Sequence, residues 1–316
     1  MIKAQVFRSS SKQFNCQILG SKEIVVASAK GALIKDHGIV VGDLVNLEQL
    51  NDQFNIVSIE ERSNQIFRII QREKKRKVIA ANVDVIVLTM SISKPKYKEG
   101  LVDRYLIRSF QWDIPLLLVF NKMDQYDAKK SPDINFQAER LKALGIKCYE
   151  LSAKQDCYQN TILANGIAEL EEELKNKTAI FLGQSGVGKS KLITKLSDGK
   201  FELKSEELAK VGKGAHTTTW SEIIDLDKFK LVDSPGIRSF SLSDLEKDDL
   251  DNSFQDLLPY FEKCKFQNCK HDEKAEGCGL NNLDSNLIET KFIISRLHSY
   301  SKILEEIEQI PAWKKT

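Results

Sequence analysis

The chain has 316 residues, of which 41% are hydrophobic and 29% are charged, with a formal net charge of +2. This composition is typical of an ordinary soluble protein with room for two or three domains and a large core. The longest apolar runs are too short to cross a bilayer, and the N-terminus lacks the layout of a signal peptide. We therefore expect a cytoplasmic protein without a membrane partner. Six scattered cysteines do not resemble a secreted disulfide framework.

The positive charge is concentrated near the N-terminus. Residues 1–79 contain 13 Lys and Arg against 8 Asp and Glu, a net charge of +5, and residues 72–77 carry much of the excess. A polyanionic partner is therefore expected at this end of the chain.

Residues 1–70 contain five short segments rich in valine, isoleucine and phenylalanine, separated by polar or glycine-containing turns. These are residues 3–7 running on to 14–19, then 23–27, 43–47, 54–60 and 65–70. The pattern predicts five strands in a small closed barrel such as an OB-fold, with an SH3-like barrel as the alternative. The basic run that follows is interpreted as a linker.

Beyond the linker, apolar strands alternate with amphipathic helices, which predicts a doubly wound, mostly parallel α/β sheet. Strands are expected at residues 83–89, 116–120, 148–151, 179–182, 222–226 and 230–233, and helices at 101–111, 134–144, 160–175 and 189–197. From about residue 240 strands stop, and a Cys/His cluster precedes a helical tail at residues 283–307.

A phosphate loop follows the expected strand at 179–182 and begins a helix. Its residues are Gly183, Gln184, Ser185, Gly186, Val187, Gly188, Lys189 and Ser190, and Lys191 comes directly after them. Glycines let the backbone N–H groups wrap an anion at the helix N-terminus, Lys189 would bridge the β- and γ-phosphates, and Ser190 would ligate Mg²⁺. The alternative is a glycine-rich turn that only joins strand to helix.

A guanine-reading motif leaves the end of the expected strand at 116–120. It consists of Asn121, Lys122, Met123 and Asp124. The Asp124 carboxylate can accept from both N1–H and the exocyclic amine of guanine, a donor pair that adenine lacks. Such a motif on its own is often only a solvated cap.

Two further motifs support the guanine interpretation, and each follows a strand. Ser152, Ala153 and Lys154 are placed to bring a backbone N–H to guanine O6, and Asp233 and Gly236 would lie near Mg²⁺ and the γ-phosphate. In an ordinary GTPase the phosphate loop precedes the base-reading motif by about a hundred residues. Here the order is reversed, which indicates a circularly permuted GTPase that binds GTP or GDP with Mg²⁺.

The first switch is expected in the glycine-rich segment 212–219, where Thr218 would bind Mg²⁺ together with Ser190 and Asp233; a plain flexible loop is the alternative. Ras-like enzymes orient the attacking water with a glutamine, but Ile237 stands at that position. Intrinsic hydrolysis should therefore be slow. The candidate catalytic residues are His216, Thr218 and Lys189, and His216 can also be a bystander.

Three thiols and one imidazole lie within fifteen residues near the C-terminus. They are Cys264, Cys269, His271 and Cys278, the donor set of a closed structural zinc site. Unlinked thiols or a redox pair are the alternatives. A metal would supply folding free energy to a segment with little apolar content.

Together these features resemble the family of ribosome small-subunit-dependent GTPases of the RsgA type, over almost the whole chain. The resemblance rests on the residues of 183–190, on His216 to Thr219, on Asp233 to Gly236 and on the Cys/His set, and the hydrophobic Ile237 is also typical of that family. It implies an OB-fold barrel, a permuted GTPase domain and a C-terminal zinc domain. It also implies GTP hydrolysis stimulated by the small ribosomal subunit, late in maturation of that subunit.

The resulting expectation is an RNA-binding barrel at 1–71, a basic linker at 72–80, a permuted GTPase domain at 81–240 and a zinc-binding domain with a helical tail at 241–316. The expected partners are the small ribosomal subunit, its rRNA and guanine nucleotide, and we expect a monomer. Two alternatives stay open. One is an RNA-binding assembly scaffold with a mainly structural nucleotide, and the other is a kinase-like or RNA-modification enzyme that shares the phosphate loop.

Overall fold

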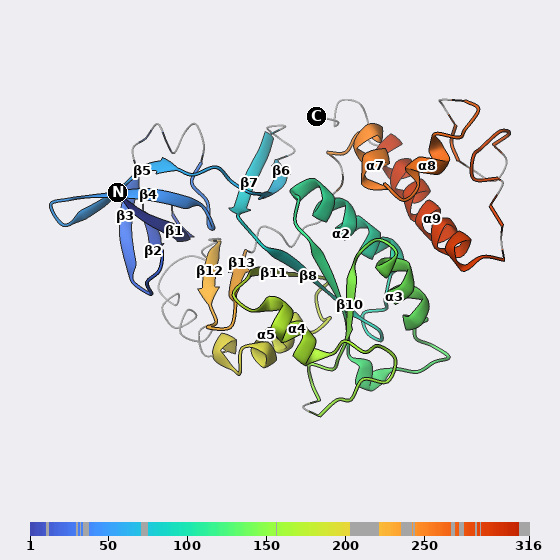
Figure 1. Cartoon of the computed structure of the whole chain (residues 1–316), viewed down its shortest axis with the longest axis horizontal. Helices are drawn as coiled ribbons and strands as arrows, with labels where there is room; N and C mark the ends of the chain where they lie inside the picture. The colour runs from blue at the N-terminus through green and yellow to red at the C-terminus, as the bar shows by residue number, and fades with distance from the viewer. Residues whose placement is uncertain are drawn as a thin grey trace.

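The computed structural model describes the chain except for residues 11–12, 30, 32, 34–37, 71–74, 156, 203–220, 235–241, 243, 267–268, 272–274, 282, 285 and 310–316. Figure 1 shows three regions in chain order, a barrel, a central α/β domain and a helical C-terminal region. No helix among the described residues is both long and apolar enough to cross a membrane.

The N-terminal barrel consists of β1 (Ile2–Ser9), β2 (Gln13–Ile18), β3 (Ile24–Ala29), β4 (Leu44–Leu50) and β5 (Gln53–Ile59). The strand order is β1-β2-β3-β5-β4, and pairing of β1 with β4 closes the barrel. The β3–β5 pair is parallel and the other barrel pairs are antiparallel. This closed five-stranded arrangement is that of an OB-fold, so the SH3-like alternative is rejected.

Three details of the N-terminal prediction were wrong. The segment from residue 3 to 19 is two strands, since β1 and β2 pair antiparallel with each other. Residues 65–70 are not the fifth barrel strand, because β6 (Gln65–Ile70) pairs with β7 (Lys75–Ala81) in a separate two-stranded sheet. Much of the presumed basic linker is therefore a strand, in which Arg76 lies over the ring of Phe67. Hydrogen bonding between β6 and β7, which a charge pattern does not reveal, explains why residues 65–70 are outside the barrel and why much of the basic run is a strand.

The central domain contains a six-stranded sheet in the order β10-β9-β8-β11-β13-β12. Its strands are β8 (Val85–Ser91), β9 (Leu116–Asn121), β10 (Lys147–Glu150), β11 (Thr178–Leu182), β12 (Glu222–Asp225) and β13 (Lys230–Asp233). All neighbouring pairs are parallel except β12 with β13. Every residue of β8, β9 and β11 is buried, as expected for strands covered on both faces.

Helices cover both faces of this sheet, as predicted for a doubly wound fold. On one face α2 (Glu99–Trp112) and α3 (Ile134–Lys142) pack against Ile86, Leu88 and Leu118. On the other, α4 (Ile167–Leu174) and α5 (Lys189–Leu196) pack against Val85, Val87 and Leu117. The helix predicted at 160–175 begins only at 167. Residues 161–163 lie in the loop before it, where their main-chain N–H groups bond the buried carboxylate of Glu150.

The C-terminal region is helical and packs on α2. It contains α7 (Lys247–Ser253), α8 (Leu258–Phe261) and α9 (Ile288–Glu308), and the region from 241 onward has no strand among its described residues. Its core unites Leu250, Phe254 and Tyr300 with Ile107 of α2.

A buried ion network crosses the boundary between the central domain and this region. Asp103 of α2 accepts from Arg140 of α3 at 2.9 Å and from Arg296 of α9 at 2.7 Å, and Arg296 also pairs with Asp256 at 3.0 Å. Asp103 and the Arg140 side chain are fully buried. Burial raises the pKa of Asp103, but the two guanidinium charges outweigh it and hold the pKa below its usual value. The network thus joins α9 to α2 and α3 of the central domain.

The barrel contacts the other edge of the central sheet. Arg8 of β1 lies opposite Glu222 of β12 and forms an ion pair with it. Lys230 of β13 bonds Gln5 at 3.0 Å and lies over the ring of Phe7. The barrel therefore contacts both β12 and β13 at this edge of the sheet.

Candidate functional site

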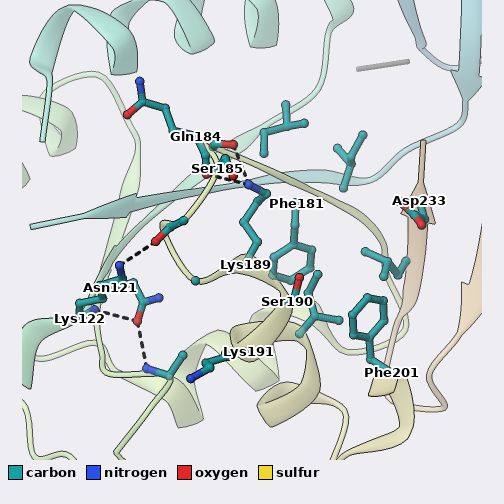
Figure 2. A pocket seen from close by; sticks show the side chains of 18 of the residues that line it. Asn121, Lys122, Phe181, Gln184, Ser185, Lys189, Ser190, Lys191, Phe201 and Asp233 are labelled. Carbon is teal, nitrogen blue, oxygen red and sulfur yellow. Dashed lines mark hydrogen bonds between the residues drawn. The ribbon is translucent and has the colours of Figure 1, made fainter. Parts of the chain in front are cut away.

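The carboxyl ends of the parallel strands meet at one edge of the central sheet, where open α/β folds bind ligands. A cavity of about 980 Å³ opens there. In Figure 2, Asn121 and Lys122 lie at one side of it, Asp233 lies at the other, and Lys189 and Ser190 lie between them. The structure thus brings together motifs that are separated along the chain.

The phosphate loop connects β11 to α5 and needs glycine at two of its positions. Gly183 has φ +134°, and a Cβ there would lie 2.2 Å from the carbonyl oxygen of Thr89 in β8. Gly188 has φ +101°, and its Cβ would lie 2.5 Å from Nδ2 of Asn121. Both positions combine a left-handed backbone with a close neighbour, so a side chain cannot be accommodated. The Lys189 ammonium bonds the carbonyls of Gly183 at 2.7 Å and Gln184 at 2.9 Å.

Asn121 holds three motif segments together from a fully buried position. Its Nδ2 donates to the carbonyl of Val187 at 2.9 Å, and its Oδ1 accepts from the main-chain N–H groups of Lys122 at 2.8 Å and Ala153 at 2.9 Å. The amide suits this role because one end donates and the other accepts. Asn121 thus links the base-reading segment to the phosphate loop and to the 152–154 segment.

The base-reading residues are positioned by short contacts. Ser152 Oγ donates to Asp124 Oδ1 at 2.6 Å, which orients that carboxylate. The Lys122 ammonium donates to the carbonyls of Gly186, at 2.7 Å, and of Lys94, so its stem lies along the cavity wall. Lys195 of α5 donates to the carbonyls of Ser152 at 3.2 Å and Gln155 at 2.6 Å.

The residues predicted to bind the nucleotide or to act on it divide into three groups. The cavity is lined by Asn121, Lys122, Asp124, Ala153, Lys154, Gly183, Gln184, Ser185, Gly186, Gly188, Lys189, Ser190, Lys191 and Asp233. Met123, Ser152 and Val187 are buried behind that wall and support it. His216, Thr218, Gly236 and Ile237 lie outside the described residues.

Several cavity residues were missed by sequence reasoning. Leu101 and Tyr105 of α2 line the cavity, and Tyr105 hydrogen-bonds the backbone of Gly183. Gln125 accepts from Ser93 at 2.7 Å, and Ser234 bonds Ser221 at 2.7 Å. The only sequence signal for Gln125 and Ser234 is that each directly follows a motif residue. Nothing in the local pattern of α2 indicates Tyr105, because its role arises from packing.

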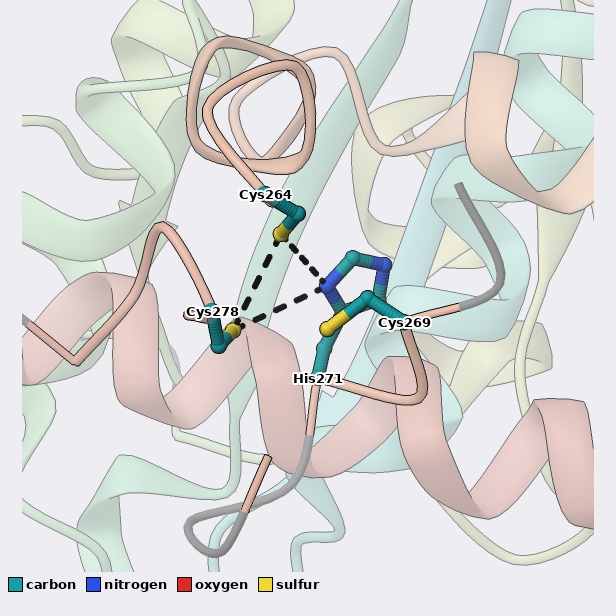
Figure 3. Close-up of side chains that lie close together, drawn as sticks. All are labelled: Cys264, Cys269, His271 and Cys278. Carbon is teal, nitrogen blue, oxygen red and sulfur yellow. Dashed lines mark hydrogen bonds between the residues drawn. The ribbon is translucent and has the colours of Figure 1, made fainter. Parts of the chain in front are cut away.

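The four predicted metal ligands converge in the C-terminal region (Figure 3). Cys264 Sγ lies 3.5 Å from His271 Nδ1 and 3.9 Å from Cys278 Sγ, and Cys278 Sγ lies 3.9 Å from His271 Nδ1. All four ligand atoms lie within 4.8 Å of one another. A tetrahedral zinc ion with Zn–S bonds of about 2.3 Å requires sulfur atoms about 3.8 Å apart, so the cluster fits this ion. Sulfur atoms this far apart are not disulfide-bonded.

Burial sets the protonation of two of the four predicted ligands. Burial lowers the pKa of His271, which keeps its imidazole neutral and able to ligate. Its ring stacks on Phe261 at 3.8 Å. Burial and the neighbouring thiols raise the pKa of Cys278 to about 12, so a thiolate there needs a cation.

The chain is similar to known proteins along most of its length. The family described as RsgA GTPase matches residues 59–243. A protein named small ribosomal subunit biogenesis GTPase RsgA from Flavobacterium psychrophilum is 32% identical over 275 residues, which cover 84% of this chain and 80% of that protein. The protein of the same name from Christiangramia forsetii is 28% identical over 308 residues, covering 95% and 92%.

Two solved structures share the fold. YjeQ from Thermotoga maritima superposes with a TM-score of 0.70 at 23% identity, covering 98% of this chain and 99% of that one. YloQ, described as a circularly permuted GTPase, superposes with a TM-score of 0.70 at 24% identity, covering 98% and 96%. The permuted order of the motifs and the barrel that precedes them are therefore features of a known architecture.

Proposed function

The chain belongs to the RsgA GTPase family, and on that premise we propose that it binds the small ribosomal subunit and hydrolyses GTP in response to it, as a late assembly factor. The hydrolysis of GTP itself follows from the family. The proposal rests on one observation. The likeness to proteins named for small-subunit biogenesis extends over 95% of the chain, so it includes the barrel and the metal cluster that flank the GTPase domain.

We assign the ends of the cavity to the two ends of one nucleotide. Asp124 reads the guanine edge, backbone N–H groups of the 152–154 segment face O6, and Lys122 lies along the ring. Lys189 bridges the β- and γ-phosphates in place of its present contacts with Gly183 and Gln184. Ser190 and Asp233, together with Thr218, would hold Mg²⁺, and Gly236 would contact the γ-phosphate. The placement of Ser190 and Asp233 on the same cavity supports this assignment.

The Cys264, Cys269, His271 and Cys278 cluster is proposed to hold one structural Zn²⁺. When bound, the ion would stabilise a segment whose own apolar core is small. The ring of His271 lies edge-on to that of Tyr300 of α9, so the ion would also secure that helix.

The barrel and the neighbouring two-stranded sheet of β6 and β7 are proposed to contact rRNA. Their net charge of +5 is suited to phosphate contacts, and OB-folds commonly bind oligonucleotides. We place the protein in the cytoplasm, where it acts as a monomer.

We propose that the bound nucleotide, GTP or GDP, changes the position of the C-terminal region. The connection is the second switch, which is the part of the chain that follows Asp233. Asp233 ends β13, and Leu242 already packs against Ile107 of α2 in the core of the C-terminal region. A γ-phosphate-dependent change at Asp233 would reposition α7 and α9 and so change affinity for the subunit.

GTP hydrolysis measured with and without purified small subunits, across a salt series, tests the proposal. We expect strong stimulation that falls as salt rises, because phosphate contacts release counterions. An unstimulated rate at every salt concentration, together with unimpaired subunit binding, would instead indicate an assembly scaffold with a structural nucleotide.

A further inference from the structure

Glu150 is a fully buried carboxylate at the end of β10, two residues before Ser152. It accepts from the main-chain N–H groups of Thr161 at 2.6 Å, Ile162 at 2.9 Å and Leu163 at 2.6 Å. The hydroxyls of Tyr158 at 2.6 Å and Thr161 at 3.2 Å also donate to it. Because hydrogen bonds to an ionised group are strong, such a concentration of donors fixes the segment that supplies them.

The donors all belong to the loop that connects β10, through residues 152–154, to α4. Residues 158–163 fold back over the end of β10, and the N–H of Glu150 itself bonds the carbonyl of Asn165 at 2.9 Å. The far end of the loop is thereby tied to the strand from which the loop departs. Burial raises the pKa of Glu150, but the bonds from Tyr158 and the three N–H groups outweigh it and hold the pKa below its usual value.

The near end of the same loop is held from the phosphate-loop helix. Lys195 bonds the carbonyls of Ser152 and Gln155, and the N–H of Gln155 bonds Ser152 Oγ at 3.2 Å. Residues 152–155 thus lie between two anchors, a carboxylate that binds amide donors and an ammonium that binds carbonyl acceptors. Their backbone N–H groups have little freedom to move relative to Asn121 and Asp124.

We propose that Glu150 is a positioning residue for guanine selectivity, which acts with Lys195 to fix the backbone N–H groups of residues 152–154 at the distance where they recognise O6 of the base. This inference deepens the proposed function and rests on it. Neither residue touches the nucleotide in this assignment. Both act through the loop.

Binding of three nucleoside diphosphates separates this role from a merely structural one. GDP carries O6, the N1 proton and the exocyclic amine. IDP retains O6 and the N1 proton but lacks the amine, and the diphosphate of 2-aminopurine riboside retains the amine but lacks both O6 and the N1 proton. In Glu150→Gln the new amide turns N–H donors toward N–H donors, which leaves buried groups unpaired. We expect affinity for GDP and IDP to fall about tenfold, while affinity for the 2-aminopurine nucleotide stays unchanged.

Two further variants complete the experiment. Lys195→Met removes the second anchor from a partly exposed position, so it reports on the same loop even if Glu150→Gln does not fold, and it should reduce the affinity for GDP relative to the 2-aminopurine nucleotide in the same way. Glu173→Gln alters a carboxylate on α4 that bonds Lys147 and Lys177, and this ratio of affinities should remain that of the parent protein.

The ratio of affinities for GDP and the 2-aminopurine nucleotide decides the matter. If Glu150→Gln and Lys195→Met retain the parent ratio, the inference is overturned even where the melting temperature falls, since Glu150 then only stabilises the fold. If the parent protein binds ADP as tightly as GDP, the guanine site itself fails and the inference fails with it.

Discussion

Asn121 provides the sharpest test of the proposed nucleotide site, because one buried amide joins three motifs. The change Asn121→Ala removes its hydrogen bonds to Val187, Lys122 and Ala153. The side chain is 1% exposed, so water does not readily replace these partners.

The magnitude follows from the groups left unpaired. Leaving a buried donor or acceptor without a partner costs about 1–3 kcal/mol. If the Val187 carbonyl and the Ala153 N–H stay unpaired, the total is about 4 kcal/mol, which corresponds to about a thousandfold in a dissociation constant. If the loops of the variant relax in the free protein, they must be reordered when the nucleotide binds, and the loss appears as a weaker affinity for GDP. If the loops stay in place, the unpaired groups lower the free energy of unfolding instead.

Both quantities must therefore be measured on the same variant. Calorimetry with GDP gives the dissociation constant, and urea unfolding of the nucleotide-free protein gives the stability. Asn55→Ala, which removes an exposed hydrogen bond to Ser28 on the barrel, is the matched control and should change neither. A loss below about 1 kcal/mol in the sum of the two measurements would refute the bridging role of Asn121.

Four other expectations test separate parts of the molecule. Gly183→Ala should abolish GDP binding because its Cβ meets the Thr89 carbonyl, whereas Gly199→Ala, which has a similar positive φ of +83° but open space around it, should retain binding in the same titration. Asp103→Asn should lower the free energy of unfolding by about 3–5 kcal/mol in urea, against no change for the exposed Asp113→Asn. Because the folded pKa of Asp103 is below its usual value, its contribution to the free energy of unfolding is present at neutral pH and is lost as pH falls below about 4. The free energy of unfolding should therefore decrease less between neutral and acid pH in Asp103→Asn than in the parent protein. A strong chelator, or Cys278→Ser, should release one zinc per chain by atomic absorption and lower the melting temperature, while Cys157→Ser at an exposed thiol should do neither. His216→Ala should slow subunit-stimulated GTP turnover without weakening GDP binding, and unchanged stimulated turnover would remove His216 from the mechanism.

The sequence alone determined the features that depend on consecutive residues. The strand–loop–helix context of 183–190, the order of the two nucleotide motifs, the alternation of strands with helices and the Cys/His spacing were all readable locally, and the family and the fold are confirmed. This succeeds because each motif has chemistry that only a few residue types at fixed spacing can supply.

Only the tertiary structure decided what depends on partners distant in the chain. Closure of the barrel through β1 and β4, the contact of Tyr105 with Gly183 and the network around Asp103 all join residues far apart in sequence. Glu150 is the clearest case, since its carboxylate binds the N–H groups of residues 161–163 in the loop before α4, a contact that periodicity does not reveal. A hydrophobic pattern reports which face is buried, whereas the partner that a buried polar group finds there is set by packing.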